Sequence, residues 1–127
     1  MKEIIKTERA PAAIGPYSQA VKVRPGTMIF CSGQIPLDPQ TGDIIGKTAS
    51  EQCHQVMENL TAVLKAAGAD FTSIVKTTIF LADMNDFSSV NDTYSGYFTT
   101  DPPARATIEV SRLPKDVKVE IEAIAIL

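Results

Sequence analysis

Two charged side chains near the C-terminal end of the chain interrupt apolar stretches and are candidates for chemistry. Arg105 stands near the start of the stretch 104–110, and Glu120 interrupts the stretch 117–126. A charged group is costly to bury unless a partner or a ligand compensates it. Because a guanidinium is permanently charged and binds a carboxylate through two parallel hydrogen bonds, Arg105 is a candidate for binding a small carboxylate ligand.

A glutamate beside such a ligand can activate a water molecule, since burial and a nearby arginine adjust the pKa of its carboxyl group. Strand alternation places Arg105 and Thr107 on one face of their segment, and Glu120 and Glu122 on one face of theirs. If the two segments form a hairpin, the faces of Arg105 and Glu120 can coincide, although the sequence does not fix the register. A weak cross-strand ion pair without catalytic function accounts for the same pattern.

Two loops and one predicted helix contain residues that suit the wall of a ligand pocket. Ser32 and Gly33 directly follow an apolar stretch, and the glycine would let a ligand approach its backbone N–H group. An ordinary turn at a strand end is the simpler interpretation of this pair. Tyr17 follows a Gly-Pro pair and presents an aromatic ring with a hydroxyl group, which can also simply pack. Asn91 lies in a predicted helix, where an exposed polar face is the simpler interpretation.

The other reactive residue types form no recognisable catalytic or metal-binding motif. Cys31 and Cys53 are not in a Cys-x-x-Cys motif, and the chain has one histidine, His54. These ligands are too few for a structural zinc site, and we expect reduced, unreactive thiols and no metal ion. The adjacency of Cys53 and His54 is interpreted as accidental, because neighbouring helix residues point in different directions.

The charge pattern argues against a nucleic acid partner, and the hydropathy pattern argues against a membrane. The net charge is −3 at pH 7, and the basic residues are scattered rather than gathered in a stripe. No stretch is apolar over the length of about 20 residues that a membrane-spanning helix needs, and the N-terminal stretch lacks the apolar run of a signal peptide. We therefore expect a cytoplasmic protein that binds neither nucleic acid nor membranes.

Apolar periodicity predicts two helices and at least five strands. Residues 49–67 have apolar side chains at helical spacing, with Thr48 and Glu51 at the spacing of a capping box. Residues 86–98 form the second predicted helix, whose aromatic residues share one side. The predicted strands, rich in β-branched residues, are 18–23, 27–32, 74–81, 104–110 and 117–126. The first two strands flank a Pro-Gly turn and are expected to form a hairpin.

The order of these elements predicts an α+β sandwich, with one mixed sheet and two helices on one face. A single domain over residues 1–127 accommodates all of them. The last strand has apolar residues on both faces, with Val119 and Ile121 on one and Ile124 and Ile126 on the other. Both faces of the sheet should therefore be buried. Because two helices cover one face only, we expect further copies of the chain to cover the other.

Four sequence blocks resemble the RidA/YjgF family of enamine/imine deaminases. They are APAAIGPYSQA (residues 10–20), FCSGQIPLDPQTG (30–42), LADMNDFSSVNDTY (81–94) and PARATIEVSRLPKDVKVEIEAIA (103–125). The resemblance implies a chorismate-mutase-like α+β sandwich that assembles as a homotrimer. In that family the sheets form a central barrel, and the ligand clefts lie between neighbouring subunits. The number of three subunits comes from the resemblance alone.

The resemblance also implies a reaction, which is hydrolysis of a reactive 2-imino acid to a 2-keto acid and ammonium. The substrate would be the tautomer of an enamine such as 2-aminoacrylate, and the enzyme a 2-iminobutanoate/2-iminopropanoate deaminase. Arg105 would bind the substrate carboxylate, and Glu120 would position water and transfer protons. Because the imine carbon is already electrophilic, the reaction needs neither a metal ion nor an organic cofactor, and positioned acid–base catalysis typically contributes about 10²–10⁴-fold.

The remaining site residues follow from the same resemblance. Gly33 would offer a backbone N–H group to the ligand, with Ser32 beside it, and Tyr17 and Asn91 would line the cleft. Position 107 departs from the pattern, because Thr107 stands where many members have cysteine. A thiol therefore has no role at this position, and Thr107 would contribute a backbone carbonyl or its hydroxyl group.

Two other functions fit parts of the pattern. The same cleft could serve a non-catalytic regulatory module that binds 2-keto acids and reports to a partner protein. A ribonuclease or translation inhibitor is a third hypothesis, since such activities are reported across the wider family. The net charge of −3 and the single histidine argue against the third hypothesis.

Overall fold

The structure is a computed structural model that describes residues 2–127, so Met1, the first residue of the expected domain, lies outside the described residues. The strands are β1 (Lys2–Ile5), β2 (Ala20–Val23), β3 (Met28–Gln34), β4 (Ile74–Leu81), β5 (Ala104–Glu109) and β6 (Val119–Ile126). The α-helices are α1 (Ala49–Ala66) and α2 (Phe87–Ser95). Short 3₁₀ helices occur at Phe71–Ser73, Met84–Asp86 and Pro114–Asp116.

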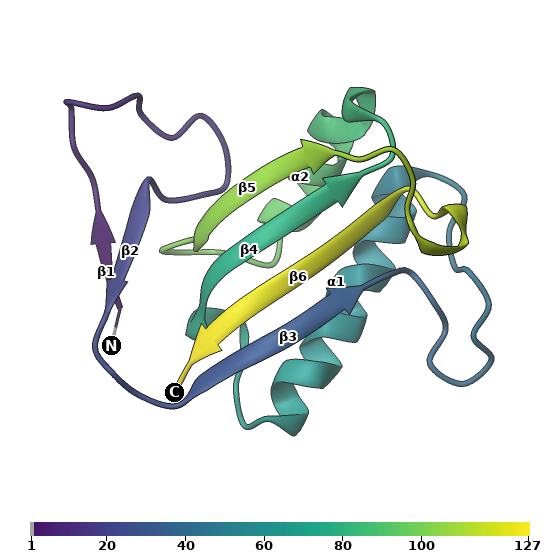
Figure 1. The fold of residues 1–127 in the computed structure, drawn as a ribbon, viewed down its shortest axis with the longest axis horizontal. Helices are drawn as coiled ribbons and strands as arrows, with labels where there is room; N and C mark the ends of the chain where they lie inside the picture. Colours follow the sequence, from purple (N-terminus) through teal and green to yellow (C-terminus); the bar gives the residue numbers. More distant parts are fainter. Residues whose placement is uncertain (1) are drawn as a thin grey trace.

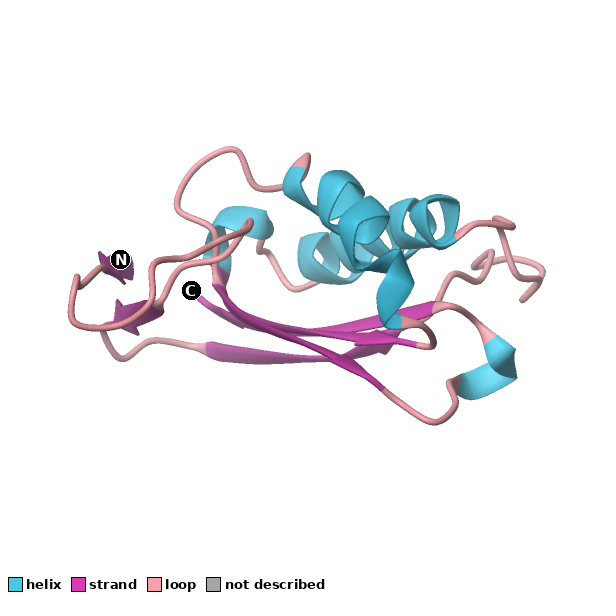
Figure 2. Ribbon diagram, turned by 90° about the horizontal axis from the view of Figure 1, so that it is seen from above, coloured by secondary structure: helices cyan, strands magenta, loops and turns pink. Residues whose placement is uncertain are grey.

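The main sheet has four strands in the order β3-β6-β4-β5, and both helices lie on one of its faces (Figures 1 and 2). The pairing of β4 with β5 is parallel, and the pairings of β6 with β3 and β4 are antiparallel. A separate two-stranded sheet, β1-β2, lies beyond one end of the main sheet (Figure 1). The predicted α+β architecture, with a mixed sheet and both helices on one face, is confirmed.

Helix α1 begins and ends as its sequence predicts. The Thr48 hydroxyl accepts a hydrogen bond from the backbone N–H of Glu51 at 3.2 Å, and the Glu51 carboxylate accepts one from the backbone N–H of Thr48 at 3.1 Å. This reciprocal capping box satisfies two of the N–H groups that a helix start leaves unpaired. Beyond the helix end, Gly68 adopts a φ of +77°, a conformation that suits glycine.

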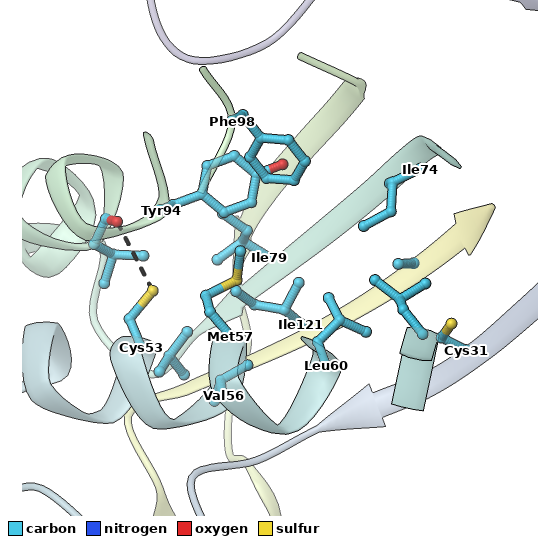
Figure 3. Packing of buried hydrophobic residues seen from close by; sticks show 14 of the residues in the cluster. Cys31, Cys53, Val56, Met57, Leu60, Ile74, Ile79, Tyr94, Phe98 and Ile121 are labelled. Carbon is cyan, nitrogen blue, oxygen red and sulfur yellow. Dashed lines mark hydrogen bonds between the residues drawn. The ribbon is translucent and has the colours of Figure 1, made fainter. Parts of the chain in front are cut away.

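The buried face of α1 packs on the sheet and on α2, and this interface is the core of the protein. Met57 and Leu60 of α1 lie against Ile79 of β4 and Ile121 of β6, and Tyr94 of α2 closes one end of the cluster (Figure 3). All five side chains are fully buried. Burial of each such side chain contributes about 1.5–3 kcal/mol, so this layer fixes both helices on the sheet.

Helix α2 is shorter than predicted, because it ends at Ser95 instead of Phe98. Phe98 nevertheless packs against Tyr94, with ring centroids 4.7 Å apart. The chain after the helix is still held against the core by aromatic packing. Its apolar residues therefore extend the sequence pattern beyond Ser95, although the helix itself has ended.

Two predicted strand pairings are wrong. Strand β2 pairs with β1, and β3 pairs with β6, so the hairpin expected around the Pro-Gly turn does not form. Strands β5 and β6 are not neighbours either, because β4 lies between them: Thr77 is aligned with Arg105 on one side and with Ala123 on the other. Helix α2 provides the crossover that a parallel β4–β5 pair requires, which explains the insertion.

In the described chain no helix covers the second face of the main sheet, as Figure 2 shows. The large apolar side chains on this open face are Met28, Phe30, Phe80, Ile108, Ile124 and Ile126. Phe30 is 71% exposed and Met28 is 52% exposed. An apolar surface of this kind marks an interaction site.

Candidate active site

Arg105 lies on the helix-covered face of the sheet and is surrounded by three aromatic rings. Its Cζ atom is 5.2 Å from the ring centroid of Tyr94, 5.4 Å from that of Tyr17 and 5.7 Å from that of Phe87. Helix α2 contributes Phe87 and Tyr94, whereas the N-terminal loop, residues 6–19, contributes Tyr17. Arg105, these three rings and Asn91 are called the Arg105 cluster below. Aromatic faces attract a cation, so this cage holds the guanidinium in place while leaving its N–H groups available for hydrogen bonds.

Asn91 fixes the orientation of the guanidinium. Its Oδ1 atom accepts a hydrogen bond from Arg105 Nη1 at 2.6 Å. Within residues 2–127 no carboxylate forms an ion pair with Arg105. Partial burial lowers the pKa of the guanidinium from its ordinary value, and the neighbouring Tyr94 and Tyr17 act in the opposite direction. A guanidinium stays protonated in proteins, so Arg105 presents a half-buried, uncompensated positive charge.

Thr107 points to the same face as Arg105, since it lies two residues further along β5. Its hydroxyl oxygen is buried and has no hydrogen-bond partner among the described atoms. An unsatisfied buried hydroxyl group costs about 1–3 kcal/mol, which is unusual in a folded protein. The Thr107 hydroxyl group therefore needs a hydrogen-bond partner that the described part of one chain does not supply.

Glu120 and Gly33 form a second cluster, which lies on the open face of the sheet. A β-bulge in β3 lies between the aligned pairs Cys31–Ala123 and Gln34–Ile121, and it contains Ser32 and Gly33. The Glu120 carboxylate occupies the space beside Gly33, where a Cβ would come within 2.8 Å of the Glu120 Cδ atom. Residue 33 must therefore be glycine for the carboxylate to lie there, and bulges of this kind often direct side chains at active sites.

The pKa of the Glu120 carboxyl group is raised above its ordinary value. Partial burial is the larger cause, and the negative charge of Glu122, two residues away on the same face of β6, is the second. Both disfavour the ionised form. A raised pKa makes the carboxylate a stronger base, which suits a group that accepts a proton from water and later returns it.

Arg105 and Glu120 lie on opposite faces of the same sheet, so one chain does not bring them together. Arg105 is aligned with the buried Thr77, whereas Glu120 is aligned with Phe80, the neighbouring position of β4 and hence on the other face. The expectation that their faces coincide in a hairpin is therefore wrong. Of the predicted site residues, Tyr17 and Asn91 accompany Arg105, and the Ser32–Gly33 bulge accompanies Glu120.

Sequence reasoning missed Phe87 and Tyr94 as neighbours of Arg105. The pattern places both on the apolar side of the second helix, and the structure agrees: Tyr94 is fully buried and Phe87 packs against the core. The hydroxyl oxygen of Tyr94 also lies 2.7 Å from Thr77 Oγ1, with which it forms a hydrogen bond. The available signal was the alignment of a parallel β-α-β unit, which places the first residues of the second strand beneath the helix. An arginine at that point must meet the aromatic residues of the helix.

The other reactive residues stay outside both clusters. Cys31 and Cys53 are free and buried, and burial raises the pKa of the Cys53 thiol to about 12. His54 is exposed on the surface, and its Nδ1 atom forms a hydrogen bond with the hydroxyl oxygen of Tyr97 at 2.8 Å. Among residues 2–127 no three acidic, histidine or cysteine side chains are grouped to hold a metal ion. No helix in this range is long and apolar enough to cross a membrane.

Two cavities border the clusters without containing them. The first, of about 570 Å³, lies under the N-terminal loop and is lined in part by Tyr17, Ser18 and Gln19. The second, of about 430 Å³, lies between α1 and the loop after β3, and Gly33 is part of its wall. Within the described chain neither cavity is lined by Arg105 or Glu120.

The fold and the caged arginine define an α+β protein with a candidate site for a small carboxylate. The chain belongs to the RidA/YjgF family: the family model described as endoribonuclease L-PSP matches residues 7–127.

Curated relatives named as deaminases match nearly the whole chain. The 2-iminobutanoate/2-iminopropanoate deaminase of Salmonella typhimurium is 53% identical over 129 residues, which cover 99% of this chain and 98% of the relative. The protein of the same name from Bos taurus is 52% identical over 126 residues, which cover 99% of this chain and 90% of the relative. The names support deamination of the Rid type.

Solved structures support the same assignment. The crystal structure of E. coli TdcF with bound serine is 47% identical in sequence and has a TM-score of 0.76, covering 98% of each chain. RidA from a Psychrobacter species is 40% identical with a TM-score of 0.77, covering 98% of this chain and 99% of the other. The fold of the chain is therefore that of the family.

Proposed function

We propose that the chain is a deaminase that hydrolyses 2-imino acids, such as the tautomer of 2-aminoacrylate, to 2-keto acids and ammonium. The observation that carries the proposal is the half-buried charge of Arg105, which is held by three rings and Asn91 and lacks a carboxylate partner in the described chain. Such a site is suited to the carboxylate of a small acid. The names of relatives more than 50% identical over nearly the whole chain support the reaction.

In the proposed reaction, Glu120 acts as base and then as acid. The substrate reacts as the protonated imine: the Glu120 carboxylate accepts a proton from a water molecule while the water oxygen bonds to the imine carbon, and the C=N π electrons pass to the nitrogen, which becomes the neutral amine of a carbinolamine. The Glu120 carboxyl group then returns the proton to that nitrogen. The C–N bond breaks as Glu120 accepts the remaining hydroxyl proton and the carbonyl forms, and the departing ammonia takes that proton and leaves as ammonium. The free N–H groups of Arg105 hold the substrate carboxylate throughout, which fixes the imine carbon relative to the water.

The separation of Arg105 from Glu120 supports a site that two subunits complete. The open face of the sheet carries Glu120 aligned with Phe80 and, further along β3, the exposed Phe30, and it needs a cover. We propose that the chain assembles as a homotrimer through this face, with the sheets in a central barrel. In each cleft between subunits, the Arg105 cluster of one subunit would then meet the Gly33–Glu120 cluster of its neighbour.

Substrate would contact the remaining site residues within this cleft. Gly33 would offer its backbone N–H group to the substrate, with Ser32 beside it. Tyr17 and Asn91, which contact Arg105, would line the cleft. Thr107, whose hydroxyl group is buried without a partner, would contribute through its backbone carbonyl or through that hydroxyl once the cleft has formed.

Replacing Glu122 with glutamine is expected to shift the acid limb of the pH–rate profile to lower pH. Activity requires ionised Glu120, so it is lost as the pH falls through the pKa of that carboxyl group, and Glu122 raises that pKa. Removing the Glu122 charge lowers the pKa and extends activity into more acidic solution. The measurement is kcat/KM against pH for both proteins, and an unchanged limb would show that another group controls it.

The proposed activity is tested by ammonia release from 2-aminoacrylate that a coupled dehydratase generates from serine. The protein should accelerate ammonia release above the spontaneous rate, and Glu120→Ala should abolish the acceleration. If the wild-type protein binds pyruvate but leaves the rate unchanged, the regulatory module is the correct function.

A further inference from the structure

Gln19 lies beside the Arg105 cluster and has a conspicuous set of contacts that the proposed reaction does not use. We propose that Gln19 is a positioning residue for carboxylate binding: its amide group holds the N-terminal loop, residues 6–19, so that Tyr17 stays against the guanidinium of Arg105. The inference rests on the proposed function, because it concerns the affinity of the same carboxylate site. The hydrogen bonds of the Gln19 side chain are to the loop and not to Arg105, so Gln19 would act on the carboxylate ligand of Arg105 only indirectly.

One side-chain amide satisfies four backbone groups across this loop. Its Oε1 atom accepts a hydrogen bond from the backbone N–H of Thr7 at 2.7 Å. The two N–H groups of its Nε2 atom are shared among three carbonyl oxygens, those of Pro11 at 2.6 Å, Thr7 at 3.1 Å and Ala10 at 3.3 Å. The loop contains neither helix nor strand, so these bonds replace those of secondary structure.

Hydrophobic burial contributes little to holding the loop. The side chains of Ala10, Ala12 and Ala13 are exposed, and Ile14 is 91% exposed. A segment with few buried apolar contacts opens at low free-energy cost unless polar contacts hold it. The amide of Gln19 is therefore the main restraint on residues 7–11.

The residue before Gln19 attaches the loop to the strand of Arg105. The backbone N–H of Ser18 donates to the carbonyl oxygen of Pro103 at 3.1 Å, and the Ser18 hydroxyl donates to the carbonyl oxygen of Pro102. Ser18 also forms an isolated β-bridge with Ala104, directly before Arg105. Ser18 thus fixes one end of the loop at the entry of β5, and Gln19 fixes the other.

Between these two restraints lies the part of the loop that approaches the guanidinium. Tyr17 places its ring centroid 5.4 Å from Arg105 Cζ, and its hydroxyl oxygen accepts a hydrogen bond from the backbone N–H of Ile14 at 3.3 Å. A Cβ at Gly15 would lie 3.4 Å from Arg105 Nη2, so the backbone itself reaches the cation. Without Gln19, this wall of the cage would move away from Arg105 for part of the time.

The test measures the dissociation constant of pyruvate, the product carboxylate, for the full-length protein by isothermal titration calorimetry. Gln19→Ala should raise the dissociation constant about tenfold, which corresponds to a lost cage wall rather than a lost charge. Gln19→Glu should cause a similar loss, because a carboxylate keeps the acceptor for Thr7 but no longer donates to the three carbonyl groups. Gln40→Ala, at an exposed turn, is the matched control and should bind pyruvate normally.

Two further readouts separate positioning from simple stabilisation. Hydrogen exchange at the backbone amides of residues 7–15 should accelerate in Gln19→Ala, while the melting temperature changes little, because the core does not include the loop. A lower melting temperature with wild-type pyruvate affinity would overturn the proposal. If Arg105→Ala also bound pyruvate normally, the proposed carboxylate site would be wrong. If only Arg105→Ala lost affinity, the site would stand and the role of Gln19 would be refuted.

Discussion

Replacing Arg105 with lysine is expected to lower kcat/KM by about 30-fold or more, although the charge is kept. An ammonium group binds a carboxylate as a point charge and lacks the planar fork of the guanidinium. Lysine would also lose the hydrogen-bonding geometry at Asn91 and the stacking against three rings. The expected loss corresponds to about 2 kcal/mol of transition-state stabilisation.

Arg105→Ala should cost more, about 3–4 kcal/mol or several hundred-fold, because both the charge and the fork are removed. Arg112→Lys is the matched control: Arg112 is exposed and forms an ion pair with Asp116 at 2.8 Å, away from the cage. This control should keep wild-type kcat/KM. Full activity in Arg105→Ala would refute the assigned carboxylate site.

Replacing Phe30 with glutamate should dissociate the proposed trimer and abolish activity. Phe30 is 71% exposed on the open face of the sheet, where it is aligned with Ile124. Burying a phenylalanine side chain contributes about 1.5–3 kcal/mol, and threefold symmetry repeats the contribution in every interface. A glutamate at the same position would bring an unpaired charge into each interface, at a cost of several kcal/mol.

The measurement is sedimentation equilibrium of the wild-type protein and the variant. The wild type should sediment as three chains of 13.7 kDa each, and Phe30→Glu as one. Val63→Glu is the control, since Val63 is a partly exposed apolar residue of α1, which lies on the face of the sheet opposite to Phe30, and the substitution should leave the mass unchanged. A trimeric Phe30→Glu, or a monomeric and active wild type, would contradict the proposed interface.

The helices could be predicted from the sequence because their determinants are local. The capping box of Thr48 and Glu51 and the apolar stripe of α1 lie within one segment, and Gly68 marks its end. Strand 74–81 was likewise predicted with its observed bounds, since its β-branched composition is also a local property.

The strand pairings could not be predicted, because pairing depends on segments far apart in the chain. The Pro-Gly turn favoured a hairpin of β2 with β3, but the N-terminal strand Lys2–Ile5 competes for β2 and β6 competes for β3. In the same way, the short connection between β5 and β6 favoured a hairpin, but β4 pairs with both. Which strand pairs with which depends on the face that each strand must bury in the core. The local sequence of a strand does not specify its pairing partner.

The candidate site was predictable in its residues but not in its arrangement. Arg105 and Glu120 were recognisable as charges in apolar strands, and Tyr17 and Asn91 came from the family resemblance. Their placement on two faces required the position of β4, since inserting one strand removes the direct alignment on which the hairpin expectation rested. Because Arg105 and Glu120 lie on opposite faces of one chain, the proposed reaction requires that two subunits complete the site.

Mixing two inactive variants tests the shared site most directly. Arg105→Ala and Glu120→Ala subunits are each expected to form inactive homotrimers. After they are denatured and refolded together in equal amounts, about a quarter of the clefts should combine an intact Arg105 with an intact Glu120 from the neighbour, because each cleft uses one residue from each of two subunits. Recovery of about a quarter of the wild-type activity is the predicted result. No recovery, in mixed trimers verified by mass spectrometry, would contradict a site that two subunits complete.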